Sequence, residues 1–63
     1  MYTGWISGPE STKDQLLSIG VELGNWDAKT YTWYNCKVKD NDTMDALEKL
    51  WGKVIWGLEE TKT

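Results

Sequence analysis

The combination of one cysteine and no histidine in 63 residues restricts how this chain is stabilised. A lone Cys36 excludes a disulfide within the chain, and without histidine it does not supply the three or four soft ligands of a structural zinc site. A chain of this length buries only about 60% of the surface that its unfolded form exposes. We therefore expect one domain, residues 1–63, that relies on dense packing or a second subunit; five tryptophans and three tyrosines suit both.

The N-terminal stretch predicts a strand followed by a turn. Thr3–Ser7 is short and carries Trp5 and Ile6, which indicates a strand that begins near Tyr2. The SGPEST segment after it, Ser7–Thr12, contains a Gly-Pro pair that breaks regular structure.

The segment that follows permits two structures. Every second residue is apolar (Leu17, Ile19, Val21 and Leu23), which is the period of a strand with one buried face. The alternative is a helix that starts after Ser11. The strict alternation and the two interspersed glycines favour the strand.

A hairpin loop at Gly24–Thr30 and a third strand over TYTWYNCKVK are predicted next, because this segment is rich in aromatic and β-branched residues. Alternation divides the strand into two faces. The face that suits a core carries Thr32, Tyr34, Cys36 and Val38. The face that suits water or a partner carries Tyr31, Trp33, Asn35, Lys37 and Lys39.

The KDNDTMDALEKLW segment predicts a helix with Asp42 or Thr43 as its N-cap. If this helix continues to Leu58, Trp51 joins its apolar stripe, whereas Trp56 lies on the polar side beside Gly52. In the alternative, the helix ends at Gly52 and Lys53–Leu58 forms a further strand. We favour the continuous helix. The predicted fold is α+β: a small antiparallel meander of about three strands with one C-terminal helix packed on one face.

Catalytic and metal chemistry are not indicated. The chain has no histidine general base, and Cys36 is expected to be a buried structural thiol. The acidic cluster that starts at Asp40 resembles the opening of a calcium-binding loop. However, Asp45 and Trp51 stand where that loop needs glycine and glutamate. We expect no enzyme activity, no cofactor and no metal site.

The net charge of −3 and the absence of arginine argue against direct nucleic-acid binding, which relies on basic contacts to phosphates and bases. No apolar run approaches the roughly 20 residues of a membrane span. The N-terminal MYTGWISGPE lacks the basic and apolar regions of a secretory signal, so we expect a cytoplasmic location.

Several aromatic residues are predicted to face outward, and tryptophan and tyrosine are enriched at the centres of interfaces. The predicted contact residues are Trp26, Tyr31, Trp33, Gly52 and Trp56. In size and composition, the chain resembles small phage-encoded proteins that inhibit a host enzyme or defence complex. We therefore expect a non-enzymatic protein-binding module, an inhibitor or regulator, that acts as a homodimer in the host cytoplasm.

Two other functions remain open. The first is a nucleic-acid-associated protein that uses strand aromatics and lysines (Tyr31, Trp33, Lys37 and Lys39). The second is a structural or assembly subunit of a larger particle. Acidic side chains that imitate phosphates (Asp40, Asp42, Asp45, Glu59 and Glu60) are a further, less favoured use of the surface.

Overall fold

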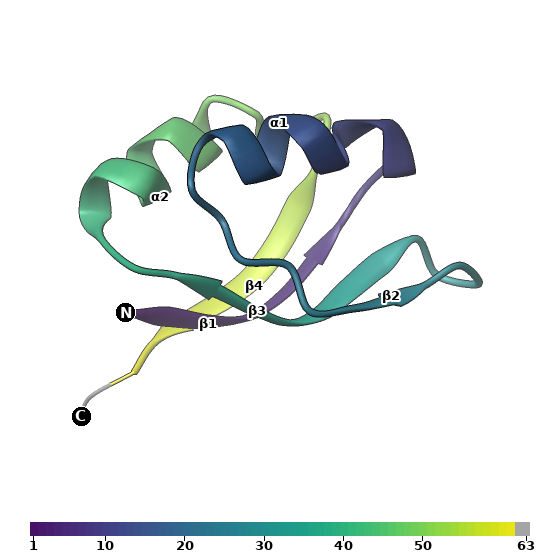
Figure 1. The fold of residues 1–63 in the computed structure, drawn as a ribbon, viewed down its shortest axis with the longest axis horizontal. Coiled ribbons are helices and arrows are strands. Elements are labelled where there is room, and N and C mark those ends of the chain that lie inside the picture. Colours follow the sequence, from purple (N-terminus) through teal and green to yellow (C-terminus); the bar gives the residue numbers. More distant parts are fainter. Residues whose placement is uncertain (62–63) are drawn as a thin grey trace.

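The computed structural model describes residues 1–61 and contains one open antiparallel sheet with helices on one face. The strands are β1 (Tyr2–Ser7), β2 (Asn25–Asp27), β3 (Thr32–Val38) and β4 (Ile55–Glu60). The helices are the 3-10 turn η1 (Glu10–Thr12), α1 (Lys13–Ser18) and α2 (Asn41–Glu48). Figure 1 shows both α-helices above the sheet. None of the helices among the described residues has the length and apolar character that crossing a membrane requires.

The strands lie in the spatial order β2-β3-β1-β4, so β1 and β3 are central and β2 and β4 are edges. This order, with a helix after β1 and another after β3, is the split βαβ arrangement of ferredoxin-like domains. The α+β class predicted from the sequence is confirmed. The predicted number of elements is wrong, because the described residues form four strands and two α-helices rather than about three strands and one helix.

The prediction of a strand over residues 17–23 is wrong, and the alternative helix is found as α1. Alternation left out Leu16, which is fully buried, whereas Leu17 is 47% exposed. Thr12, Leu16 and Ile19 follow a helical spacing and turn one face toward the core. Gly20 ends the helix with φ +98°, a conformation that favours glycine, and the chain then turns to bury Val21.

The helix α2 also differs from its prediction, at both ends. Its N-cap is Asp40, not Asp42 or Thr43, because the Asp40 carboxylate accepts a 2.8 Å hydrogen bond from the Thr43 backbone N–H. The helix ends at Glu48, and the chain reverses around Gly52, whose φ is +103°. The continuous helix to Leu58 is therefore wrong, and the alternative strand is present as β4.

Pairing with β1 explains why the last segment becomes a strand. All six residues of β4 pair with β1 from Tyr2 to Ser7, which satisfies backbone groups along its inner side. Strand alternation also lets Trp56 and Leu58 pack against the core beside Ile6. Trp51 lies outside the core and is 62% exposed, so its predicted place in the apolar stripe of a helix is wrong.

The core lies between the sheet and the two helices. Its buried apolar members come from every layer of the fold: Ile6, Leu16, Val21, Trp33, Cys36, Val38, Leu47 and Val54. Both α-helices cover the same face of the sheet (Figure 1), so the opposite face has no covering element among the described residues.

Candidate interaction surface

The uncovered face of the sheet carries three large exposed side chains. Ile6 points into the core, so alternation turns Trp5 to the other side of β1. Ile55 of β4 pairs with Ser7 and shares that side. Trp5, Tyr34 and Ile55 are 38%, 43% and 47% exposed, and we call these three residues the open-face cluster.

A β-bulge brings Tyr34 to this cluster. Gly4 pairs with Cys36 and Ile6 pairs with Trp33, so Trp5 faces two residues of β3, Tyr34 and Asn35. The extra residue reverses the alternation within β3. Asn35 accommodates the bulge with φ +61°, and asparagine is one of the few residue types that adopt this conformation readily.

The bulge accounts for two errors in the predicted faces of β3. Tyr34 was assigned to the core but is exposed, and Trp33 was assigned to the outer face but is only 2% exposed. Cys36 and Val38, which follow the bulge, are buried as predicted. The signal that sequence analysis missed is the asparagine in the middle of an aromatic, β-branched strand.

Gly57 positions the Trp5 indole. A Cβ atom at residue 57 would lie 2.5 Å from Nε1 and 2.6 Å from Cε2 of Trp5. The indole ring therefore lies directly against the backbone of β4, in space that only glycine leaves open. Although Trp5 belongs to β1, its ring packs on β4, which fixes the position of the ring on the open face.

Two shallow hollows adjoin the open-face cluster, and Trp5 and Tyr34 line both. The larger, about 440 Å³, extends along β3 to Asn35 and Lys37. The smaller, about 300 Å³, extends to Ile55 of β4. The two aromatic rings thus form a ridge with a recess on each side, a relief that an apolar side chain of a partner can fit.

The structure separates the five contact residues predicted from the sequence into two groups. Trp26, Tyr31 and Trp33 lie at the β2 side of the sheet, whereas Gly52 and Trp56 lie at the β4 side. These sides are opposite edges, so the five residues do not form one surface. The open-face cluster was not predicted from the sequence. Its residues come from β1, β3 and β4 and lie on the face of the sheet opposite the helices.

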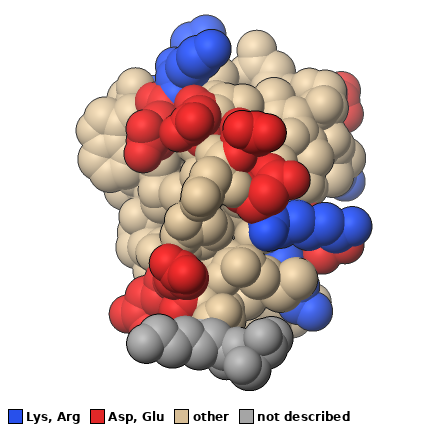
Figure 2. Space-filling model, turned by 90° about the vertical axis from the view of Figure 1, so that its left-hand side faces the viewer, with Lys and Arg blue, Asp and Glu red and all other residues tan. Residues whose placement is uncertain are grey.

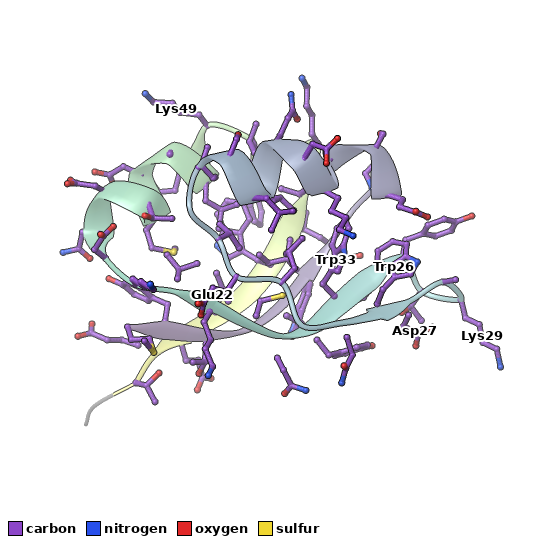
Figure 3. The ribbon with its side chains drawn as sticks, in the orientation of Figure 1. Glu22, Trp26, Asp27, Lys29, Trp33 and Lys49 are labelled. Carbon is purple, nitrogen blue, oxygen red and sulfur yellow. The ribbon has the colours of Figure 1, made fainter. Side chains whose placement is uncertain are left out.

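In the first group, Trp26 packs on Trp33 with ring centroids 4.3 Å apart. Figure 3 shows both side chains on the helix side of the sheet. Tyr31, 60% exposed at the end of the β2–β3 turn, makes a T-shaped contact with Trp26, with ring centroids 6.2 Å apart. Of the three, Tyr31 is the one that projects into solvent, while Trp33 is a core residue.

In the second group, Trp56 is half-buried and its ring meets that of Trp51 edge to face, with centroids 4.8 Å apart. Gly52 has no neighbouring atom within 4 Å of the position where a Cβ would lie. The predicted placement of Gly52 beside Trp56 on the polar side of a helix is wrong, because α2 ends at Glu48 and Trp56 lies on β4. The exposed aromatic here is Trp51.

Acidic side chains gather at one end of the molecule. Figure 2 views this end and shows carboxylates in two groups with lysines between and beside them. The exposed acidic residues of α2, its cap and the end of β4 are Asp40, Asp42, Asp45, Glu48, Glu59 and Glu60. The hydrogen bond from the Thr43 backbone N–H lowers the pKa of Asp40. The Asp40 carboxylate is therefore protonated at a lower pH than an ordinary aspartate.

The thiol of Cys36 is buried and hydrogen-bonded. Its Sγ donates a 3.2 Å hydrogen bond to the Trp33 carbonyl, and burial raises the pKa of the thiol. Both features favour the neutral, unreactive form. Within residues 1–61, no three cysteine, aspartate or glutamate side chains form a group that could hold a metal ion.

No protein-family model, no curated protein and no solved structure matches this chain.

Proposed function

We propose that this chain is a non-enzymatic protein-binding module that docks to its partner through the uncovered face of the sheet. The observation that carries the proposal is the open-face cluster: Trp5, Tyr34 and Ile55 are exposed together on the face opposite both helices. Tryptophan and tyrosine bury a large area on binding at a small entropic cost. In this role the chain acts as an inhibitor or regulator by occupying a surface of the partner.

The build of the face supports this proposal. Trp5 is held against Gly57, and Tyr34 is set by the bulge at Asn35, so both rings are pre-organised by the backbone. A rigid aromatic loses less conformational entropy on binding than a mobile one. The rim is mixed in charge, with Lys37 on β3 and Glu59 on β4, as at protein interfaces with a polar rim.

The test begins with affinity capture from a lysate of the organism of origin, followed by mass spectrometry and expression of the captured protein. The dissociation constant is then measured for the wild type, Trp5→Ala and Tyr34→Ala. Each substitution is expected to weaken binding by at least about tenfold. Leu17→Ala is the matched control, because Leu17 is as exposed as Ile55 but lies on α1.

Thermal unfolding of each variant separates a lost contact from a lost fold. Wild-type affinity in both Trp5→Ala and Tyr34→Ala, with intact folds, contradicts the proposal. A loss confined to Tyr31→Ala or Trp51→Ala instead assigns the interface to an edge of the sheet.

Single-stranded nucleic acid is a second candidate, favoured by one observation. Trp5 and Tyr34 lie on the two central strands of a four-stranded sheet, the position from which such sheets stack bases, and Lys37 lines the same hollow. Trp33 no longer belongs to this candidate, because it is buried. The net charge of −3 weighs against it. Titration of a fluorescent oligothymidylate and an oligouridylate at low salt tests it, and anisotropy that does not change removes it.

A further inference from the structure

The strand β4 is an open edge of the sheet. Among residues 1–61, the one strand that pairs with β4 is β1, and the Thr61 N–H donates a 2.7 Å hydrogen bond to the Met1 carbonyl. In an antiparallel ladder, residues alternate between pointing both backbone groups at the neighbouring strand and pointing both away. Thr61 points inward, so the backbone N–H and C=O groups of Trp56, Leu58 and Glu60 point outward.

The usual protections of an edge strand are few along β4. Its pairing with β1 runs through six residues without a bulge, and the strand contains no proline. Its charges, Glu59 and Glu60, stand at its C-terminal end. The opposite edge, β2, is only three residues long. Of the two edges, β4 is therefore the one that offers a long backbone ladder to another strand.

Apolar side chains flank this ladder on both faces. On the helix side, Trp51 is 62% exposed and packs on the half-buried Trp56. On the open side, Ile55 is 47% exposed. A strand added at this edge would form hydrogen bonds with the outward backbone groups and would bury these apolar side chains. Both the hydrogen bonds and the burial favour its addition.

The charges at the two ends of β4 favour a second copy of this chain as the added strand, and they favour the antiparallel direction. The exposed Lys53 stands just before the strand, and Glu59 stands near its end. Two copies aligned antiparallel place the lysine end of one against the glutamate end of the other, and do so twice because of the two-fold symmetry. With Trp56 opposite Trp56 of the second copy, the register puts Lys53, in the turn before β4, opposite Glu59. The outward groups of the two Trp56 residues meet at the axis, and each Leu58 N–H faces the C=O of Val54, whose own N–H already donates to the Leu50 carbonyl at 3.1 Å.

We propose that β4 binds a second copy of this chain by antiparallel strand pairing about a two-fold axis at Trp56. The two sheets then form one continuous sheet of eight strands, with Trp51 and Trp56 of both copies packed beside the axis. This inference does not depend on the proposed function, because it concerns the edge of the sheet and not its open face.

A charge exchange tests the pairing. Sedimentation equilibrium measures the dimer dissociation constant of the wild type, Lys53→Glu, Glu59→Lys and the double variant. Each single substitution places like charges opposite each other and is expected to raise the dissociation constant about tenfold or more, whereas the double variant restores the opposite-charge pairs and the wild-type value. Lys49→Glu is the matched control, since Lys49 lies on the far side of the helix layer in Figure 3; it is expected to leave dimerisation unchanged.

Amide hydrogen exchange locates the interface in the wild type. The Leu58 amide points outward and Gly57 pairs inward with Trp5. Raising the protein concentration to about 1 mM, where even a weak dimer forms, is expected to slow exchange at Leu58 at least about tenfold relative to a dilute sample. Exchange at Gly57 is expected to change little. A chain that stays monomeric at this concentration overturns the proposal, and so does a dimer in which Leu58 gains no protection.

Discussion

The Trp5 indole lies against the backbone of Gly57 on the neighbouring strand, so close that a single added methyl group would lie 2.5 Å from Nε1. This contact joins β1 to β4 on the open face of the sheet. It sets the orientation of one of the two aromatic rings in the proposed binding surface. The stability of the fold and the shape of the surface therefore depend on the same pair of residues.

Gly57→Ala is expected to destabilise the fold by about 1–3 kcal/mol, because the new Cβ displaces the Trp5 ring. Urea unfolding measures the change. A double-mutant cycle supplies the control: in a Trp5→Ala background, the methyl group meets no indole, and the cost of Gly57→Ala should largely disappear. Equal costs in both backgrounds would show that the strand backbone, and not the ring, requires glycine.

Asn35→Ala is expected to cost about 1–2 kcal/mol, since alanine lacks the tolerance of asparagine for φ +61°. Asn35→Gly relieves the same constraint and should stay near the wild-type stability. Urea midpoints of the three proteins distinguish this backbone effect from loss of a side-chain contact. Two substitutions of equal cost would contradict it.

Leu16 and Leu17 provide a direct test of α1. Leu16→Ala removes a fully buried side chain and is expected to cost about 2–5 kcal/mol, whereas Leu17→Ala at an exposed position should change stability by less than about 0.5 kcal/mol. The strand predicted from alternation requires the reverse ranking, with Leu17 in the core. Chemical denaturation of the two variants decides between them.

The N-cap of α2 gives a pH dependence at low pH. Because the pKa of Asp40 is lowered in the folded state, its contribution is complete above the unfolded pKa and is lost as pH falls through the folded value. We expect the urea midpoint of the wild type to fall in acid more steeply than that of Asp40→Asn, which retains a capping oxygen without the charge. Parallel pH profiles for the two proteins would exclude the carboxylate as the cause.

Cys36 gives a second pH dependence, of opposite sign. Burial raises the pKa of the Cys36 thiol above its usual value of 9.0, because the folded protein favours the neutral thiol over the thiolate. The stability of the fold that depends on the neutral thiol is therefore complete below pH 9.0 and is lost as pH rises through the pKa of the folded state. A thiol reagent such as dithionitrobenzoate should react slowly with the native protein and rapidly in urea. Equal rates in the two conditions would show an accessible, reactive cysteine.

The errors in the expected fold share one physical origin. The segment from Leu17 to Leu23 fits a helix or a strand, and so does the segment from Lys53 to Leu58, because both are short and apolar. In each case the choice depended on burial against distant residues. Helix α1 buries Leu16 against the sheet, and β4 pairs with β1 from the other end of the chain.

The periodicity of the sequence did not predict the open-face cluster, for the same reason. A single extra residue at Asn35 exchanged the faces of Trp33 and Tyr34, and no periodicity within β3 reveals where a bulge occurs. Trp5 and Ile55 are distant in sequence and meet only because β4 adds to the edge beside β1.

What the sequence determined by itself was set by composition and by strongly periodic local segments. One cysteine excluded a disulfide within the chain, and the absence of histidine removed histidine as a general base or metal ligand. The aromatic and β-branched residues from Thr32 to Val38 predicted a strand, and the acidic segment after Asp40 predicted the start of a helix; both elements are present. The tertiary structure decided which aromatics are core and which are surface, because that choice depends on strand pairing and bulges, where small local preferences are overridden by the burial of large side chains.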